Sequence, residues 1–144
     1  MKLWLSAELS CKVLSQEQLD QERIARNFVE ETLNSRLLNE SYDIPIQQWN
    51  CIGIIMGEND FDERIYYSPK RKDMDFRLKI DPIAFKSTDD LGRERLIFAM
   101  LLRSLDLLKA KFEKARPKFD PKVYDELERL RNDALEVAKE KNWV

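Results

Sequence analysis

Acidic residues are crowded into one short segment near the middle of the chain. Four carboxylates fall within six residues, at Glu58, Asp60, Asp62 and Glu63. Closely spaced carboxylates can bind a divalent cation, but a twelve-residue calcium loop starting at Glu58 would need glycine at position 63 and glutamate at position 69. Those positions hold Glu63 and Pro69. Two alternatives stay open: a solvated turn, or an acidic surface around Phe61 that steers a basic partner.

Histidine is absent from the chain, and this absence removes several kinds of chemistry. Without imidazole there is no Ser-His-Asp or Cys-His arrangement and no histidine-containing zinc site. The two cysteines, Cys11 and Cys51, lie far apart in sequence and match no metal-binding spacing. Pairs of Asp and Glu could still act as general acid and base, but no spacing singles out one pair. We therefore expect no enzymatic activity, no metal site and no cofactor.

A charged strand face is the clearest functional pattern in the sequence. Met74, Phe76, Leu78 and Ile80 alternate with charged residues, which is typical of a strand with one buried face. The charged positions include Asp75, Arg77 and Lys79. A metal-dependent nuclease would need a carboxylate where Arg77 stands, so this face is expected to meet water or a partner.

Alternation in the first residues places Trp4 opposite the aliphatic side of an opening strand. If that strand pairs beside residues 74–80, Trp4 shares a face with Arg77, and an aromatic residue among mixed charges is typical of a binding hot spot. The predicted partner-binding residues are Trp4, Glu58, Asp60, Phe61, Asp62, Glu63, Tyr66, Asp75, Arg77 and Lys79.

Periodicity predicts the order of the elements. A capping box from Ser15 to Gln18 predicts a helix over 15–39, with Leu19, Ile24, Phe28, Leu33 and Leu37 as its inward stripe. Strands are predicted at 48–56, 64–67 and 74–80, and helices follow from about 88 to 115 and from 121 onward. On the last helix, Asp125 and Arg129 are expected to form a solvated pair. The predicted fold is α+β, in the order βαβββαα, with an antiparallel sheet of about four strands and helices packed mainly on one face.

Size and charge indicate one globular domain spanning residues 1–144. The 25 basic and 27 acidic residues give a net charge of −2, which argues against direct binding of nucleic acid or an anionic membrane. No window contains the roughly 20 apolar residues of a membrane span, and the N-terminal residues do not form a signal peptide. A cytoplasmic location and a protein partner are therefore expected.

Three segments resemble a bacterial immunity-protein family, immunity protein 44. They are residues 2–8, KLWLSAE, residues 76–81, FRLKID, and residues 101–108, LLRSLDLL. The resemblance implies a cytosolic antidote that binds the C-terminal domain of a secreted or contact-dependent toxin, often a nuclease, and neutralises it without catalysis. A non-catalytic adaptor or homo-oligomeric assembly domain is the alternative interpretation.

Overall fold

A computed structural model describes residues 5–9, 14–37, 39–44, 51–57, 64–68, 73–114 and 120–144. Within the strands, it describes side chains only at positions 65 and 76–79. The strands are β1 (Leu5–Leu9), β2 (Cys51–Gly57), β3 (Arg64–Ser68) and β4 (Asp73–Lys79). The helices are α1 (Gln16–Arg36), α2 (Pro82–Lys86), α3 (Asp90–Lys114) and α4 (Lys122–Glu140).

The strands form one mixed sheet in the order β1-β2-β4-β3. β1 pairs with β2 in parallel, and β2 pairs with β4 in parallel. Only β3 and β4 are antiparallel. The prediction of an antiparallel α+β sheet is therefore wrong, and most of the described residues are helical.

The physical reason for this correction lies in the connections. α1 carries the chain from β1 to β2, and a helical crossover returns the chain in the same direction. β4 then lies between β2 and β3, so it runs parallel to β2 and antiparallel to β3. Because β2 separates β1 from β4, the opening strand does not pair beside the charged strand as the sequence interpretation required.

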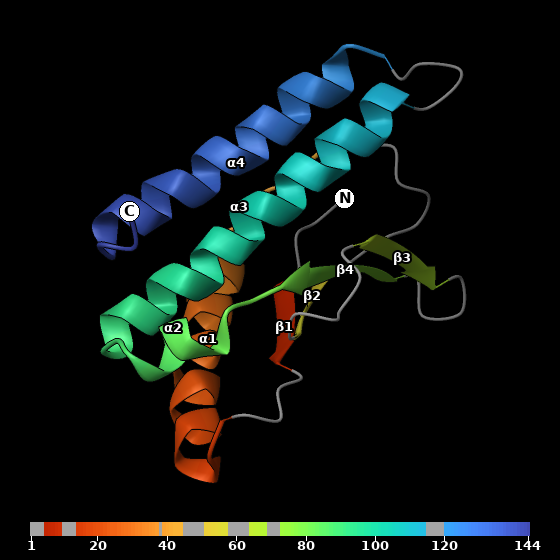
Figure 1. Cartoon of the computed structure of the whole chain (residues 1–144). Coiled ribbons are helices and arrows are strands. Elements are labelled where there is room, and N and C mark those ends of the chain that lie inside the picture. The colour runs from red at the N-terminus through yellow and green to blue at the C-terminus, as the bar shows by residue number, and fades with distance from the viewer. Residues whose placement is uncertain are drawn as a thin grey trace.

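The helices lie on one side of the sheet in Figure 1, where α1 contacts β1 and α3 contacts β2 and β4. Phe76 and Leu78 of β4 are fully buried against them. α4 lies along α3 and contributes a stripe of buried residues to the core: Val123, Leu127, Leu130, Ala134, Val137 and Ala138. The core therefore lies between the helices and one face of the sheet.

α1 begins where its local sequence predicts but presents a different face. The Ser15 hydroxyl accepts a hydrogen bond from the Gln18 backbone N–H, and the Ser15 backbone N–H donates to the Gln18 side chain. The buried residues of the helix, however, are Glu22, Ala25, Val29 and Leu33. Ile24 and Phe28 are 66% and 43% exposed, so the prediction that they face inward is wrong.

The short helix α2 was not predicted. Asp81 caps it by accepting a hydrogen bond from the Ile83 backbone N–H at 3.0 Å, and Pro82 occupies the first turn. Both residues are recognised helix-start signals. Phe85 is buried in the core, and α2 contacts α1 and α3.

The C-terminal residues fold back onto the helices. Asn142 has a positive φ of 60°, which turns the chain after α4. The Trp143 backbone N–H then donates to the Ala138 carbonyl at 2.9 Å. The Trp143 ring lies 5.7 Å from that of Phe98 and 6.2 Å from that of Phe28, and its indole N–H donates to Glu94 at 3.0 Å.

Candidate functional site

The face of the sheet that turns away from the core is the candidate binding surface, and we call it the open face. Because Phe76 and Leu78 are buried, alternation puts Arg77 and Lys79 on the other face of β4. Arg77 is half-buried and Lys79 is exposed. Two of the residues predicted from the sequence are thus accessible on one strand.

Pairing register adds neighbours to this face. Tyr66 of β3 lies directly opposite Asp75 of β4, and Arg64 lies opposite Arg77. On the other side, Gly53, Ile55 and Gly57 of β2 pair with Asp75, Arg77 and Lys79. Residues paired across a sheet share a face, so Tyr66, Asp75, Arg77 and Lys79 of the predicted set come together on the open face.

The remaining members of the predicted set lie outside the described residues. They are Trp4, Glu58, Asp60, Phe61, Asp62 and Glu63. The interpretation of residues 58–63 as an acidic surface therefore stays a prediction, as does the role of Trp4. Among the described residues, no group of three or more His, Cys, Asp or Glu side chains is arranged to hold a metal ion.

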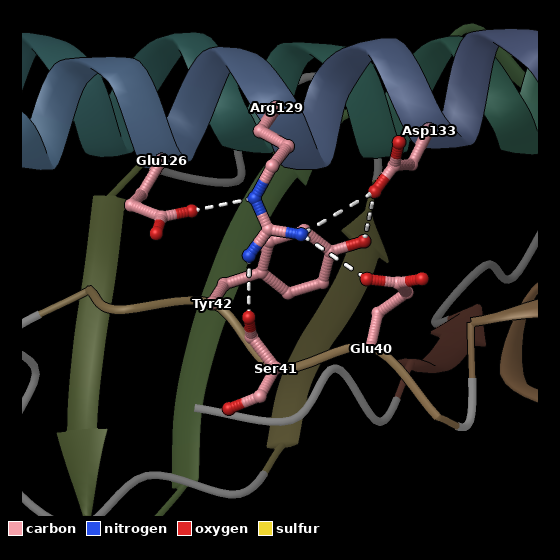
Figure 2. A network of polar contacts seen from close by, with 6 residues as sticks. All are labelled: Glu40, Ser41, Tyr42, Glu126, Arg129 and Asp133. Carbon is pink, nitrogen blue, oxygen red and sulfur yellow. Dashed lines mark hydrogen bonds and ion pairs between the residues drawn. The ribbon is translucent and has the colours of Figure 1, made fainter.

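A polar network that the sequence did not predict surrounds Tyr42 (Figure 2). Tyr42 follows α1 and is fully buried, and its hydroxyl donates a hydrogen bond of 2.7 Å to Asp133 of α4. The Arg129 guanidinium carbon lies 4.3 Å from the centre of the Tyr42 ring, within the range of a cation–π contact. Burial and the neighbouring Asp133 carboxylate raise the pKa of the Tyr42 hydroxyl well above its usual range.

Every nitrogen of the Arg129 guanidinium has a partner within the protein. Nε donates to Glu126 at 2.7 Å, one terminal nitrogen donates to Glu40 at 3.2 Å, and the other donates to the Ser41 carbonyl. The expected solvated pair with Asp125 is replaced by these contacts. Because Arg129 is occupied in this way, the network serves to attach residues 40–42 to α4 and does not form a ligand site.

A hollow lies between α3 and α4, with a volume of about 200 Å³. Leu105, Tyr124 and Leu127 line it. At its edge, Arg131 of α4 forms an ion pair of 2.9 Å with Asp106 of α3. This ion pair joins the two helices, so the charges of both residues are paired within the protein.

Comparison with known proteins identifies the family of the chain. The family described as immunity protein 44 matches residues 1–140, nearly the whole chain. The chain belongs to the immunity protein 44 family. Neither a curated protein nor a solved structure matches it. Membership of the immunity protein 44 family confirms the resemblance found in the sequence and directs attention to protein-binding surfaces.

The open face stays the candidate binding surface for this member of the immunity protein 44 family. Lys79 is exposed and Arg77 is half-buried on this face, whereas the contacts of the Tyr42 network connect residues 40–42 to α4. In the described part of the chain, no helix has the length and apolar character needed to cross a membrane.

Proposed function

We propose that the protein binds the C-terminal toxin domain of a cognate secreted or contact-dependent toxin and neutralises it in the cytoplasm. Membership of the immunity protein 44 family is the observation that carries this proposal. The toxin domain is proposed to be a nuclease, and the immunity protein acts by occupying its surface. No chemical step, cofactor, nucleic acid or membrane takes part.

The open face supplies the proposed contact surface. Arg77 projects from the middle of β4, between Asp75 and Lys79, and its guanidinium offers several donors in a planar arrangement suited to a partner's polar groups. Arginine and tryptophan are enriched among residues that dominate binding energy at interfaces. We therefore propose Arg77 and Trp4 as anchors, with Tyr66 and the acidic residues 58–63 as further contacts.

The test is coexpression with the toxin domain encoded beside this gene. Growth should be restored when both proteins are made, and the two should copurify as a complex. Arg77→Ala and Trp4→Ala should each weaken binding by roughly 1 to 4 kcal/mol while leaving the circular dichroism spectrum unchanged. Lys114→Ala and Lys122→Ala, at exposed positions where α3 ends and α4 begins, are controls expected to bind like the original protein.

Two results would contradict the proposal at different levels. If the neighbouring protein is harmless and does not bind, toxin neutralisation is wrong, and concentration-dependent self-association would then support an assembly domain. If the complex forms but both anchor variants bind normally, the function stands and the assigned surface is wrong.

A further inference from the structure

β3 forms one edge of the sheet. Among the described strands it pairs only with β4, because the strand order ends in β4-β3. α1 contacts β1 at the opposite edge, whereas none of the described helices makes extensive contact with β3 (Figure 1). Along its outer side β3 therefore carries backbone N–H and C=O groups that no described strand satisfies. An edge of this kind can accept a further strand.

The sequence of β3 suits pairing with another strand. Its three central residues, Ile65, Tyr66 and Tyr67, are β-branched or aromatic, which are the residue types enriched in strands. Natural edge strands are commonly protected from pairing by lysine, by proline within the strand or by a bulge. β3 contains no lysine or proline, and its pairing with β4 is continuous over all five residues. The strand is therefore short but regular, as strand addition requires.

Opposite charges flank β3 in the sequence. Residues 58–63, which come directly before the strand, carry four carboxylates, and we call them the acidic flank. Residues 70–72, which follow the strand after Pro69, are Lys, Arg and Lys, and we call them the basic flank. The five residues of strand between the two flanks span about 17 Å at the usual rise per residue. Along the chain, β3 thus runs from an acidic flank to a basic flank.

Two copies of this strand are complementary when they run antiparallel. The register that pairs all five residues places Tyr66 opposite Tyr66 of the second copy and Ile65 opposite its Tyr67. Arg64 then lies opposite Ser68, so no like charges face each other within the strands. Antiparallel direction also brings the acidic flank of each copy to the basic flank of the other. A parallel pair would instead place acid beside acid and base beside base.

We propose that the outer edge of β3 receives β3 of a second copy of the chain, in antiparallel register about Tyr66. The contact is symmetric, so both flanks of both copies take part. Added strands lie side by side within a sheet, so the open face stays uncovered in both copies. A contact of five residues from each copy is small for a permanent complex, and the dimer is expected to dissociate on dilution.

The first experiment tests the register by disulfide formation. Cys11→Ser and Cys51→Ser remove the native thiols, and Tyr66→Cys is added to this background. Residues directly opposite on antiparallel strands have Cα atoms about 4.5 to 5.5 Å apart, within the range of a disulfide. Air oxidation catalysed by copper phenanthroline should therefore link most of the Tyr66→Cys protein into dimers, seen on a non-reducing gel.

Tyr67→Cys in the same background is the matched control, because it changes the next residue of the same strand. The proposed register places the two copies of residue 67 about 8 Å apart between Cα atoms, which is too far for a disulfide. Tyr67→Cys alone should therefore stay mostly unlinked, whereas a mixture of Tyr67→Cys with Ile65→Cys should form linked dimers. Equal linking of Tyr66→Cys and Tyr67→Cys would overturn the register.

The second experiment exchanges the charges of the flanks, and it uses the protein without toxin because the acidic flank is also a proposed toxin contact. Lys70→Glu with Lys72→Glu makes both flanks acidic. Asp60→Lys, Asp62→Lys and Glu63→Lys together make both flanks basic. Each variant alone should dimerise at least about 10-fold more weakly than the original protein, because like charges meet at both ends of the strand pair.

Mixing the acidic and basic variants restores opposite charges at both ends, so sedimentation velocity should detect a dimer with one copy of each. Lys114→Glu combined with Lys122→Glu lowers the net charge as much as the acidic variant does. It should change dimerisation by less than about threefold, because charges away from the contact are screened. Failure of the mixed pair to form would overturn the contact between the flanks.

Further outcomes would overturn the proposal without touching toxin neutralisation. The original protein should dimerise as its concentration rises, and a protein that stays monomeric up to about 1 mM contradicts this, since a dissociation constant of about 1 mM would leave half of the chains paired. A dimer that Tyr66→Cys does not link has its contact elsewhere. A monomer whose β3 amides become protected from hydrogen exchange only in the toxin complex would assign this edge to a strand of the toxin domain.

Discussion

Tyr42 brings a phenol into the core while its hydroxyl reaches the partly exposed Asp133 carboxylate. Burial is the larger cause of its raised pKa, because an ionised phenolate would lose its hydration. In the unfolded chain the same group titrates near pH 10. The folded state therefore holds this proton at pH values where the unfolded state releases it.

The sign of the resulting pH dependence follows from this difference. A raised folded pKa contributes stability that is fully present below pH 10 and decreases as pH rises above it. We expect Tyr42→Phe to reduce the steepness of the loss of unfolding free energy above pH 10, measured by urea denaturation. At pH 7 the variant should lose about 1 to 2 kcal/mol, since the hydrogen bond to a charged acceptor is removed.

Tyr124→Phe is the matched control, because Tyr124 lies half-buried on α4 outside this network. At pH 7 this variant should lose less unfolding free energy than Tyr42→Phe, because it keeps the hydrogen bond between Tyr42 and Asp133. An unchanged slope in Tyr42→Phe would show that Tyr42 ionises in the folded state as readily as in the unfolded chain.

Gly92 is required by a close contact in the first turns of α3. Its backbone N–H donates to Asp89 at 2.8 Å, and Thr88 folds over it. A Cβ atom built at position 92 would lie 1.6 Å from the Thr88 hydroxyl oxygen and 2.8 Å from the Thr88 Cβ. The side chain of Thr88 must therefore move before any larger residue fits.

Gly92→Ala is expected to lower the melting temperature, although alanine normally stabilises a helix by about 1 kcal/mol relative to glycine. Thermal denaturation followed by circular dichroism measures the change. Combining it with Thr88→Ala removes the nearest obstructing atom and should restore part of the loss. A rise in melting temperature for Gly92→Ala alone would mean that Thr88 adjusts at no cost.

At the scale of elements, alternation along β4 places the residues that stabilise the fold on one face and the residues proposed to bind a partner on the other. Leu78 is fully buried and its neighbour Lys79 is exposed. Leu78→Ala should lower the free energy of unfolding by about 2 to 5 kcal/mol through lost burial and a cavity. Lys79→Ala shortens a side chain on the other face, and its free energy of unfolding should stay within about 0.5 kcal/mol of that of the original protein.

Urea denaturation of both variants checks this expectation, since each places alanine in the same strand. Equal losses would show that the open face is covered in solution. If both variants unfold with the same free energy as the original protein, the helices do not pack on β4.

Several features of the elements could be predicted from residues that are close together in sequence. Ser15 and Gln18 specify the start of α1 because a capping box is made by residues three positions apart. The alternation in β4 likewise separates Phe76 and Leu78 from Arg77 and Lys79. Asp81 and Pro82 carried the signal for α2, but a helix of one turn leaves too short a pattern for periodicity to detect.

Features that depend on distant partners could not be predicted in this way. Hydrophobicity assigned Ile24 and Phe28 to the core, whereas the packing of α1 against α3 buries Glu22 beside Arg26 instead. Burial of Glu22 raises the pKa of its carboxyl, and Arg26 opposes that shift. The Arg129 contacts with Glu40 and Ser41 depend on how the chain returns past α4, which no local spacing encodes.

At the scale of the whole molecule, Trp143 joins the C-terminal turn to α1 and α3. Its ring is almost fully buried against Phe28 and Phe98, whereas Val144 is 59% exposed. Trp143→Ala should cost about 3 to 5 kcal/mol in unfolding free energy, because a large aromatic side chain leaves the core. Val144→Ala should change stability by less than about 0.5 kcal/mol.

Guanidinium chloride denaturation measures both changes. Trp143→Phe should retain part of the packing while removing the N–H that donates to Glu94. Its loss of unfolding free energy should therefore lie between those of Trp143→Ala and Val144→Ala. A negligible loss in Trp143→Ala would mean that the C-terminal turn is not docked on the helices in solution.

The direction of the strands was the main feature of the whole molecule that the sequence did not reveal. Alternation reports which residues of one strand share a face, but it does not say which strand lies alongside. The open face could therefore be outlined around Arg77 before the structure, while the neighbours Arg64 and Gly57 depended on the register.

The mixed pairing also suggests the order in which the strands pair during folding. β3 and β4 join residues that are near in sequence, such as Ser68 and Asp73, so this hairpin can close early. β1 meets β2 only after the whole of α1 has been made, as in the pair Leu5 and Ile52, and closing that longer loop costs more entropy. Of the four described strands, β1 is thus expected to pair last, although it is made before the others, and until then β2 carries an unpaired edge that chaperones, or another copy of the chain, can reach.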